Sequence, residues 1–177
     1  MTARGLRVLI GVLAVVLVAL LVVAWMTAGT RLRGKPVAVP AQGVGDSVVA
    51  MSLYAGKHPR ADEVRKQLQE HFDAINSRNY AAWRATVVPE RATAMSEEAF
   101  AKEYASTRDG SVYIERIDDL PSGAMLVRVR FISAQDLANA PSDVRATRIC
   151  WRNTLPMDGT PPRIGVSFGG SSRKAAC

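Results

Sequence analysis

The fold is decided by a stretch that reads MLVRVRFISA, residues 125–134. Its odd-numbered positions from 125 to 131 are all apolar, whereas Arg128 and Arg130 occupy even-numbered positions. Successive side chains of a β-strand point to opposite faces, so the alternation predicts a strand with one buried and one basic face. We expect this strand to cover residues 124–134.

A second segment, residues 147–155, has the same pattern. Ile149 and Trp151 fall on one face of the expected strand, and Arg148 and Arg152 fall on the other. Two adjacent strands that alternate in this way bury one common face of a sheet. The apolar face is therefore expected to carry the helices of the domain.

Two further β-rich segments flank this pair. Residues 111–118 precede it, and residues 163–168 follow a turn at Asp158 and Gly159. Short alternating segments joined by turn residues are typical of antiparallel sheets. We predict a curved antiparallel sheet of about four strands.

Helical periodicity dominates the chain before this sheet. Residues 62–76 place apolar side chains at helical spacing. Residues 80–87 predict a shorter helix that Pro89 stops, and residues 97–106 predict a third helix capped by Ser96. Three helices followed by an antiparallel sheet indicate an α+β fold.

The N-terminal region is apolar enough to cross a membrane. No charged residue occurs between Val8 and Thr30. As a helix these residues would span about 34 Å, and a bilayer core is about 30 Å thick. A cleaved signal peptide is the alternative, but its apolar region is only about 7 to 15 residues long. We predict a transmembrane helix over residues 8–30, after a cytoplasmic head over residues 1–7.

The remaining chain divides into three parts. Residues 31–57 contain several Pro and Gly residues and no sustained periodicity, which predicts a flexible stalk. Residues 58–170 form the predicted domain, and residues 171–177 form a tail. Basic residues flank the apolar segment almost equally, so the charge distribution does not decide its orientation. We place the domain outside the cytoplasm because a short head before a long C-terminal domain is typical of a signal anchor.

The positive charge is concentrated near the predicted membrane segment. The 177 residues carry a net charge of +7, but residues 1–35 hold five basic residues and no acidic one. The other residues therefore carry only 18 basic against 16 acidic side chains. This distribution favours contact with anionic lipid and argues against nucleic-acid binding.

The order of elements resembles the NTF2-like (SnoaL-like) cone fold over residues 58–170. The segments that carry the resemblance are Ala81-Ala82-Trp83, Cys150-Trp151-Arg152, the Asp158-Gly159 turn and Pro162-Arg163-Ile164. The resemblance implies three helices packed on a curved sheet, with a pocket between them.

An outer NTF2-like domain on a single anchor and short stalk resembles the Mce-associated membrane proteins of lipid transport. It is also similar in plan to the bridge component of type IV secretion. These resemblances imply an accessory or scaffold role in a bacterial cell-envelope complex, with the membrane and other envelope proteins as partners. A small-ligand-binding module and an isomerase or hydrolase are the alternatives. The 18 Arg against 5 Lys are typical of GC-rich bacterial coding.

Candidate pocket residues follow from the cone. The aromatic side chains expected to line the pocket are Tyr80, Trp83, Tyr104 and Trp151. Ordinary core packing is the alternative reading of all four. Asp73 and Asp118 are the only acids we place near such a cavity, and nothing pairs them with a nucleophile. We therefore assign no catalytic residue, cofactor or metal.

The second candidate site is the basic sheet face. Its members are Arg128, Arg130, Arg148 and Arg152. Such a face could dock an acidic partner, anionic lipid headgroups or a second copy of the chain. The alternative is a solvated face balanced by Glu115 and nearby acids.

Two sequence features concern covalent chemistry. Cys150 and Cys177 form a disulfide or remain two independent thiols; an oxidising compartment would favour the disulfide. Residues 165–169 match the Gly-x-Ser-x-Gly pattern of serine hydrolases. The eight residues that follow include no His, Asp or Glu, so we reject a nucleophile there.

Overall fold

The computed structural model describes residues 16–18 and 39–177. The chain divides into two compact units, Met1–Pro36 and Val37–Cys177, and the second holds the described domain. The predicted head lies outside the described residues, as does all of the predicted transmembrane helix except the helical residues 16–18. Among the described residues, no helix is both long enough and apolar enough to span a bilayer.

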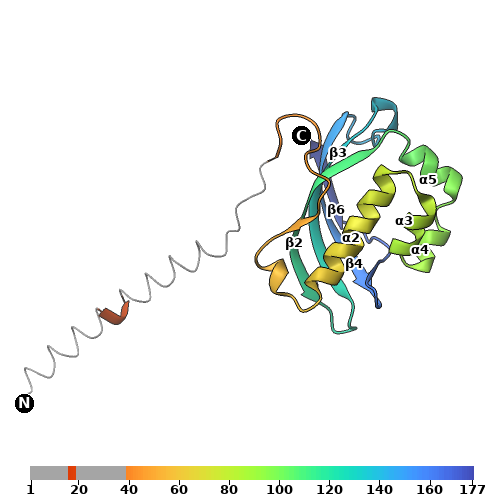
Figure 1. Ribbon diagram of the computed structural model, residues 1–177. Helices are drawn as coiled ribbons and strands as arrows, with labels where there is room; N and C mark the ends of the chain where they lie inside the picture. The colour runs from red at the N-terminus through yellow and green to blue at the C-terminus, as the bar shows by residue number, and fades with distance from the viewer. Residues whose placement is uncertain (1–15, 19–38) are drawn as a thin grey trace, which may run out of the picture. The chain divides into compact units, whose positions relative to one another are not determined.

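The domain is built on a six-stranded mixed sheet with helices on one side (Figure 1). The strand order is β1-β2-β3-β4-β5, with β6 also paired to β4. The strands are β1 (Ala50–Met51), β2 (Arg108–Asp119), β3 (Met125–Ala134), β4 (Arg148–Asp158), β5 (Arg163–Ile164) and β6 (Ser172–Ala176).

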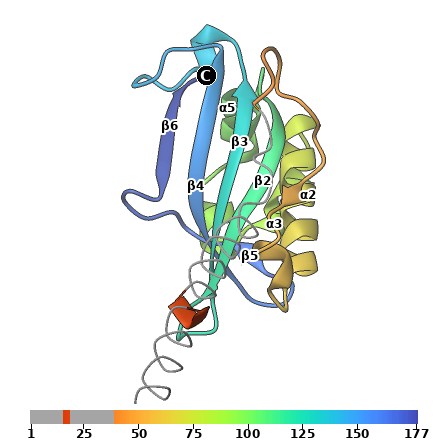
Figure 2. The same ribbon diagram turned by 90° about the vertical axis from the view of Figure 1, so that its left-hand side faces the viewer.

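In the described domain the sheet has six strands where about four were predicted; the four predicted strands pair in antiparallel register, but the sheet as a whole is mixed. β1 pairs in parallel with β2, and β6 pairs with β4 in antiparallel register. The predicted fourth strand, residues 163–168, is paired only over Arg163–Ile164. After β5 the chain returns to pair with β4 a second time as β6, which lies beside β4 in Figure 2.

The α+β class is confirmed, with one more helix than expected. The helices are α2 (Ala61–Asn76), α3 (Tyr80–Thr86), α4 (Pro89–Thr93) and α5 (Glu97–Glu103), with short 3-10 helices η1 (Ala55–Lys57) and η2 (Leu137–Asn139). α3 ends at Thr86, within one residue of the predicted end, and Pro89 then begins α4. Proline suits the first helical position because the N–H that it lacks would have no partner there.

The core lies between α2 and the sheet. Leu68 on α2 is fully buried, in agreement with the helical spacing of apolar residues. Val127 on β3 is also fully buried, in agreement with the predicted alternation. Trp83 on α3 is also fully buried, and its ring lies 5.3 Å from that of Phe100 on α5. This aromatic contact joins the short helices to one another.

The end of the predicted stalk is packed against the domain. Val49 and Ala55 are buried, and β1 extends the sheet beside β2. Residues 39–46, which we call the entry segment, cross the sheet near Gly110. A Cβ atom on Gly110 would lie 2.7 Å from the Val44 carbonyl oxygen, so only glycine allows this approach.

Candidate functional site

A cavity of about 220 Å³ lies between the helices and the sheet face that they cover. It combines aromatic walls with several polar side chains, the usual character of a small-molecule site. The lining residues described below are His71, Arg91, Tyr104, Asp109, Gln135 and Trp151.

Asp109 is the buried acid of this cavity. The backbone of Asp109 is held by Asn76, whose side chain accepts from its N–H at 2.7 Å and donates to its carbonyl at 3.0 Å. The Ser133 hydroxyl donates to the carboxylate. Burial raises the pKa of Asp109 to about 6, against the smaller opposing effect of Ser133.

His71 on α2 is neutral and held in one tautomer. The Thr86 hydroxyl donates to the Trp83 carbonyl oxygen at 2.7 Å, so its own oxygen accepts from His71 Nδ1 at 2.7 Å. Nδ1 therefore carries the proton, and Nε2 keeps a free lone pair. Burial, with a smaller effect of Arg91, lowers the pKa of His71 to about 3.

Two buried donors on the cavity walls have no partner in the described part of the chain. They are Nε2 of Gln135 and Nε1 of Trp151. A buried N–H without an acceptor costs about 1 to 3 kcal/mol. Trp83 Nε1 is also unpaired, but Trp83 does not line the cavity.

Arg91 and Tyr104 add two further donors. Burial lowers the pKa of Arg91, while Tyr104 and Glu103 oppose that shift. Its guanidinium donates to the Gly165 carbonyl oxygen at 3.4 Å. Burial raises the pKa of Tyr104, so its hydroxyl keeps its proton. Arg91, Tyr104, Gln135 and Trp151 therefore each bring a hydrogen-bond donor to the cavity lining.

The four predicted aromatic residues separate into two groups. Tyr104 and Trp151 line the cavity, whereas Tyr80 and Trp83 belong to the aromatic core. Tyr80 donates its hydroxyl to the Met95 carbonyl oxygen at 2.6 Å. Its polar atom is therefore already satisfied.

Neither predicted acid lies in the cavity. Asp73 is exposed on α2 and accepts from Gln69 at 3.0 Å. Asp118 pairs with Arg116 near the far end of β2. The cavity acid is Asp109, which lies just before the predicted strand over residues 111–118. A register shift between Gly110 and Tyr113 interrupts the alternation that would have placed Asp109 in that strand.

Sequence reasoning also missed His71, Arg91 and Gln135 as cavity residues. His71 sits on the apolar face of α2, where a lone histidine among hydrophobic positions was its only signal. Arg91 comes from α4, which was not predicted. Gln135 follows the end of β3 and has no distinguishing pattern.

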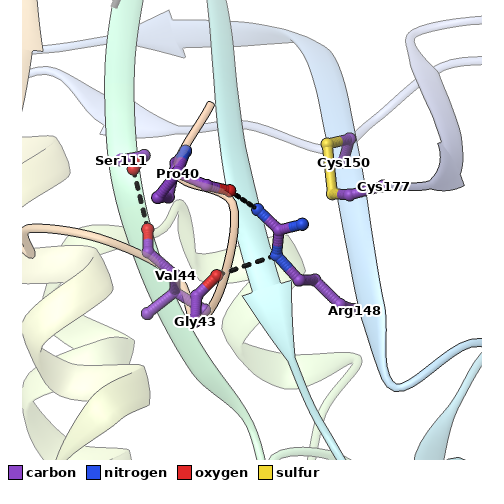
Figure 3. Close-up of a disulfide and its surroundings, with 7 residues drawn as sticks. All are labelled: Pro40, Gly43, Val44, Ser111, Arg148, Cys150 and Cys177. Atoms are coloured by element: carbon purple, nitrogen blue, oxygen red, sulfur yellow. Dashed lines mark hydrogen bonds between the residues drawn. A yellow bond between two sulfur atoms is a disulfide. The ribbon is translucent and has the colours of Figure 1, made fainter. Parts of the chain in front are cut away.

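The four predicted docking arginines have three different surroundings. Arg130 and Arg152 line a second hollow, of about 280 Å³. Arg128 lies 4.0 Å from Asp118. Arg148 donates to the carbonyl oxygens of Pro40 and Gly43 in the entry segment (Figure 3).

The structure joins Cys150 and Cys177 by a disulfide, with 5.2 Å between their Cα atoms (Figure 3). The predicted tail reaches Cys150 because β6 pairs along β4, with Cys150 opposite Ala175. The disulfide fixes the C-terminus to a central strand.

Comparison with family models, with curated proteins and with solved structures finds no match to this chain. Within the described residues, no group of three His, Cys, Asp or Glu side chains is arranged to hold a metal ion.

Proposed function

We propose that this protein is a membrane-anchored, extracytoplasmic binding module that holds a small oxygen-bearing molecule in the cavity between its helices and sheet. The observation that carries the proposal is the pair of unpartnered donors, Gln135 Nε2 and Trp151 Nε1. Both side chains line the cavity that also contains the buried carboxyl of Asp109. A ligand with acceptor oxygens would accept hydrogen bonds from both N–H groups and so remove the free-energy cost of leaving them unpaired.

Binding accounts for the cavity better than catalysis does. His71 Nε2 has a free lone pair, but a pKa of about 3 makes it a hydrogen-bond acceptor and a weak base at neutral pH. Ser133 and Thr107 line the cavity, but the Ser133 hydroxyl donates to the Asp109 carboxylate and not to His71, so no lining hydroxyl is paired with a base as in a serine hydrolase. His71 would orient a ligand hydroxyl instead.

The helices and curved sheet support the further proposal that the domain is an NTF2-like cone. The uncharged run between Val8 and Thr30 supports a single-pass anchor with the N-terminus inside. The disulfide supports an oxidising compartment outside the cytoplasm. An accessory role in a cell-envelope complex, of the Mce lipid-transport type, remains the proposed setting for this binding module.

Indole N–H resonances test the proposal directly. The full chain has three Trp residues, and in detergent micelles each gives one indole signal. We would titrate the ¹⁵N-labelled chain with dicarboxylates, hydroxy acids and polyols. At least one compound should shift the Trp151 signal and leave the Trp83 signal in place.

Two matched variants complete the test. Trp151→Phe removes one indole N–H from the cavity, and Trp83→Phe removes one from the core. The first should weaken binding of the active compound at least tenfold, and the second should leave it unchanged. Equal effects of the two variants, or no compound that shifts Trp151, would refute the proposal.

A further inference from the structure

The sheet face turned away from the helices carries a row of three arginines. Arg130 on β3 is paired with Arg152 on β4, and Arg152 is paired with Arg173 on β6. Directly paired residues of neighbouring strands project from the same face. Three guanidinium groups therefore stand side by side on one surface.

The positive charge of this row is only partly neutralised by acidic side chains. Arg130 lies 3.7 Å from Glu115, and its guanidinium carbon lies 4.7 Å from the centre of the Tyr113 ring. In the domain formed by residues 39–177, neither Arg152 nor Arg173 takes part in an ion pair. Like charges directly opposite each other destabilise a sheet, so an anion bound here would be stabilising.

The arginine row borders the hollow of about 280 Å³. Ile132, Cys150, Ala175 and Val39 give this hollow an apolar lining beside the guanidinium groups. The site suits a molecule with an anionic end and an apolar end.

We propose that this hollow binds the phosphate of an anionic phospholipid headgroup, with Arg152 and Arg173 as its main ligands. Guanidinium groups match phosphate oxygens through paired, charge-assisted hydrogen bonds. The apolar lining receives the carbon atoms next to the phosphate. A second copy of the chain is disfavoured on this face because it would bring another arginine row against the first.

Along the sequence, only eight residues separate the hollow from the predicted membrane segment. Val39 lines the hollow, and residues 31–38 connect it to the end of the predicted span. A fully extended chain reaches about 3.6 Å per residue, so these residues span at most about 29 Å. This step rests on the anchor in the proposed function, whereas the arginine row and the hollow do not.

The test measures lipid binding by the full chain in a neutral maltoside detergent. The probes are dioctanoyl phosphatidylglycerol, dioctanoyl phosphatidylcholine, glycerol 3-phosphate and inorganic phosphate, each titrated by calorimetry. Phosphatidylglycerol should bind at least tenfold more tightly than the other three. Equal binding of inorganic phosphate would show a soluble-anion site and overturn the lipid proposal.

Two double variants remove the same charge from the same sheet face. Arg152→Gln with Arg173→Gln should lower the affinity for phosphatidylglycerol at least tenfold. Arg116→Gln with Arg128→Gln lies beside Asp118, away from the hollow, and should change it less than twofold. An equal loss in both would indicate general charge attraction and overturn the site.

Folding and the proposed function are checked separately. Circular dichroism melting of the Arg152 and Arg173 variant should give a midpoint no lower than that of the parent chain, because charge repulsion is relieved. If the double variant melts at a lower temperature than the parent chain, we would repeat the binding test with the single Arg152→Gln variant. Trp151 lines both the cavity and the hollow beside the arginine row, so the indole titration is repeated on the Arg152→Gln with Arg173→Gln variant. A Trp151 shift that persists in this variant reports on the cavity, and one that disappears reports on the hollow.

Discussion

Replacing Asp109 by asparagine should stabilise the folded domain at neutral pH. Burial raises the pKa of this carboxyl to about 6, compared with its ordinary value of 3.8. Only 4% of the residue is exposed, so solvent screens the effect little. The difference in pKa corresponds to about 3 kcal/mol of unfolding free energy.

The sign of the effect follows from proton binding. Between about pH 4 and pH 6 the folded chain keeps a proton on Asp109 that the unfolded chain has lost. Its contribution to stability is therefore full below about pH 4 and lost above about pH 6. The asparagine side chain does not titrate, and its carbonyl oxygen still accepts from Ser133. The Asp109→Asn variant should match the parent chain at pH 4 and exceed its stability by up to about 3 kcal/mol at pH 8.

His71 has the opposite pH dependence. Its pKa of about 3 in the folded chain lies below the ordinary 6.5, so stability should rise by about 5 kcal/mol as pH increases from about 3 to 6.5. The two slopes partly cancel in the parent chain. Subtracting the parent curve from the Asp109→Asn curve removes the His71 contribution.

Urea unfolding of the full chain in detergent, followed by circular dichroism from pH 4 to pH 8, gives both curves. Asp73→Asn is the matched control, because Asp73 is an exposed acid on α2. We expect a stabilising effect from relieved burial only in the Asp109→Asn variant. A stability difference for Asp109→Asn that is the same at pH 4 and pH 8 would refute the argument from burial.

Two other substitutions test the disulfide and the histidine. Cys177→Ser should lower the free energy of unfolding by about 3 to 4 kcal/mol in the chain-entropy model, given the 27-residue separation, and adding Cys150→Ser should cost little more. Urea unfolding measures both, and alkylation of the parent chain without reductant would contradict the disulfide. Thr86→Val should cost about 1 to 3 kcal/mol because it leaves the His71 Nδ1 proton unpaired. Thr93→Val, which removes an exposed hydroxyl from α4, should cost less, and equal losses in urea would contradict a stabilising hydrogen bond between His71 and Thr86.

The strands that could be predicted are those with one buried face. β3 and β4 alternate because one side of each packs on the helices. β6 reads Ser-Arg-Lys-Ala-Ala and buries none of these residues, so its place depends on backbone pairing that no side-chain pattern records. β1 has two residues, too few to show a period.

The site was harder to predict than the fold. An aromatic residue on a helix has the same spacing in a core and in a pocket, so Trp83 and Tyr104 could not be separated by sequence. The bulge in β2 breaks the alternation that would have placed Asp109 inside. Arg173 was missed with β6, although it completes the arginine row.

Both ends of the described domain, residues 39–177, are attached to β4, and this has a mechanical consequence. The entry segment is hydrogen-bonded to Arg148, and the C-terminus is bonded to Cys150, two residues further along the same strand. Tension on the chain before Val39 would therefore act first on the Arg148 and Ser111 hydrogen bonds to the entry segment. Because β4 is hydrogen-bonded to strands on both edges, the force on β4 is shared by the neighbouring strands, and we expect this to occur before β1 separates from β2.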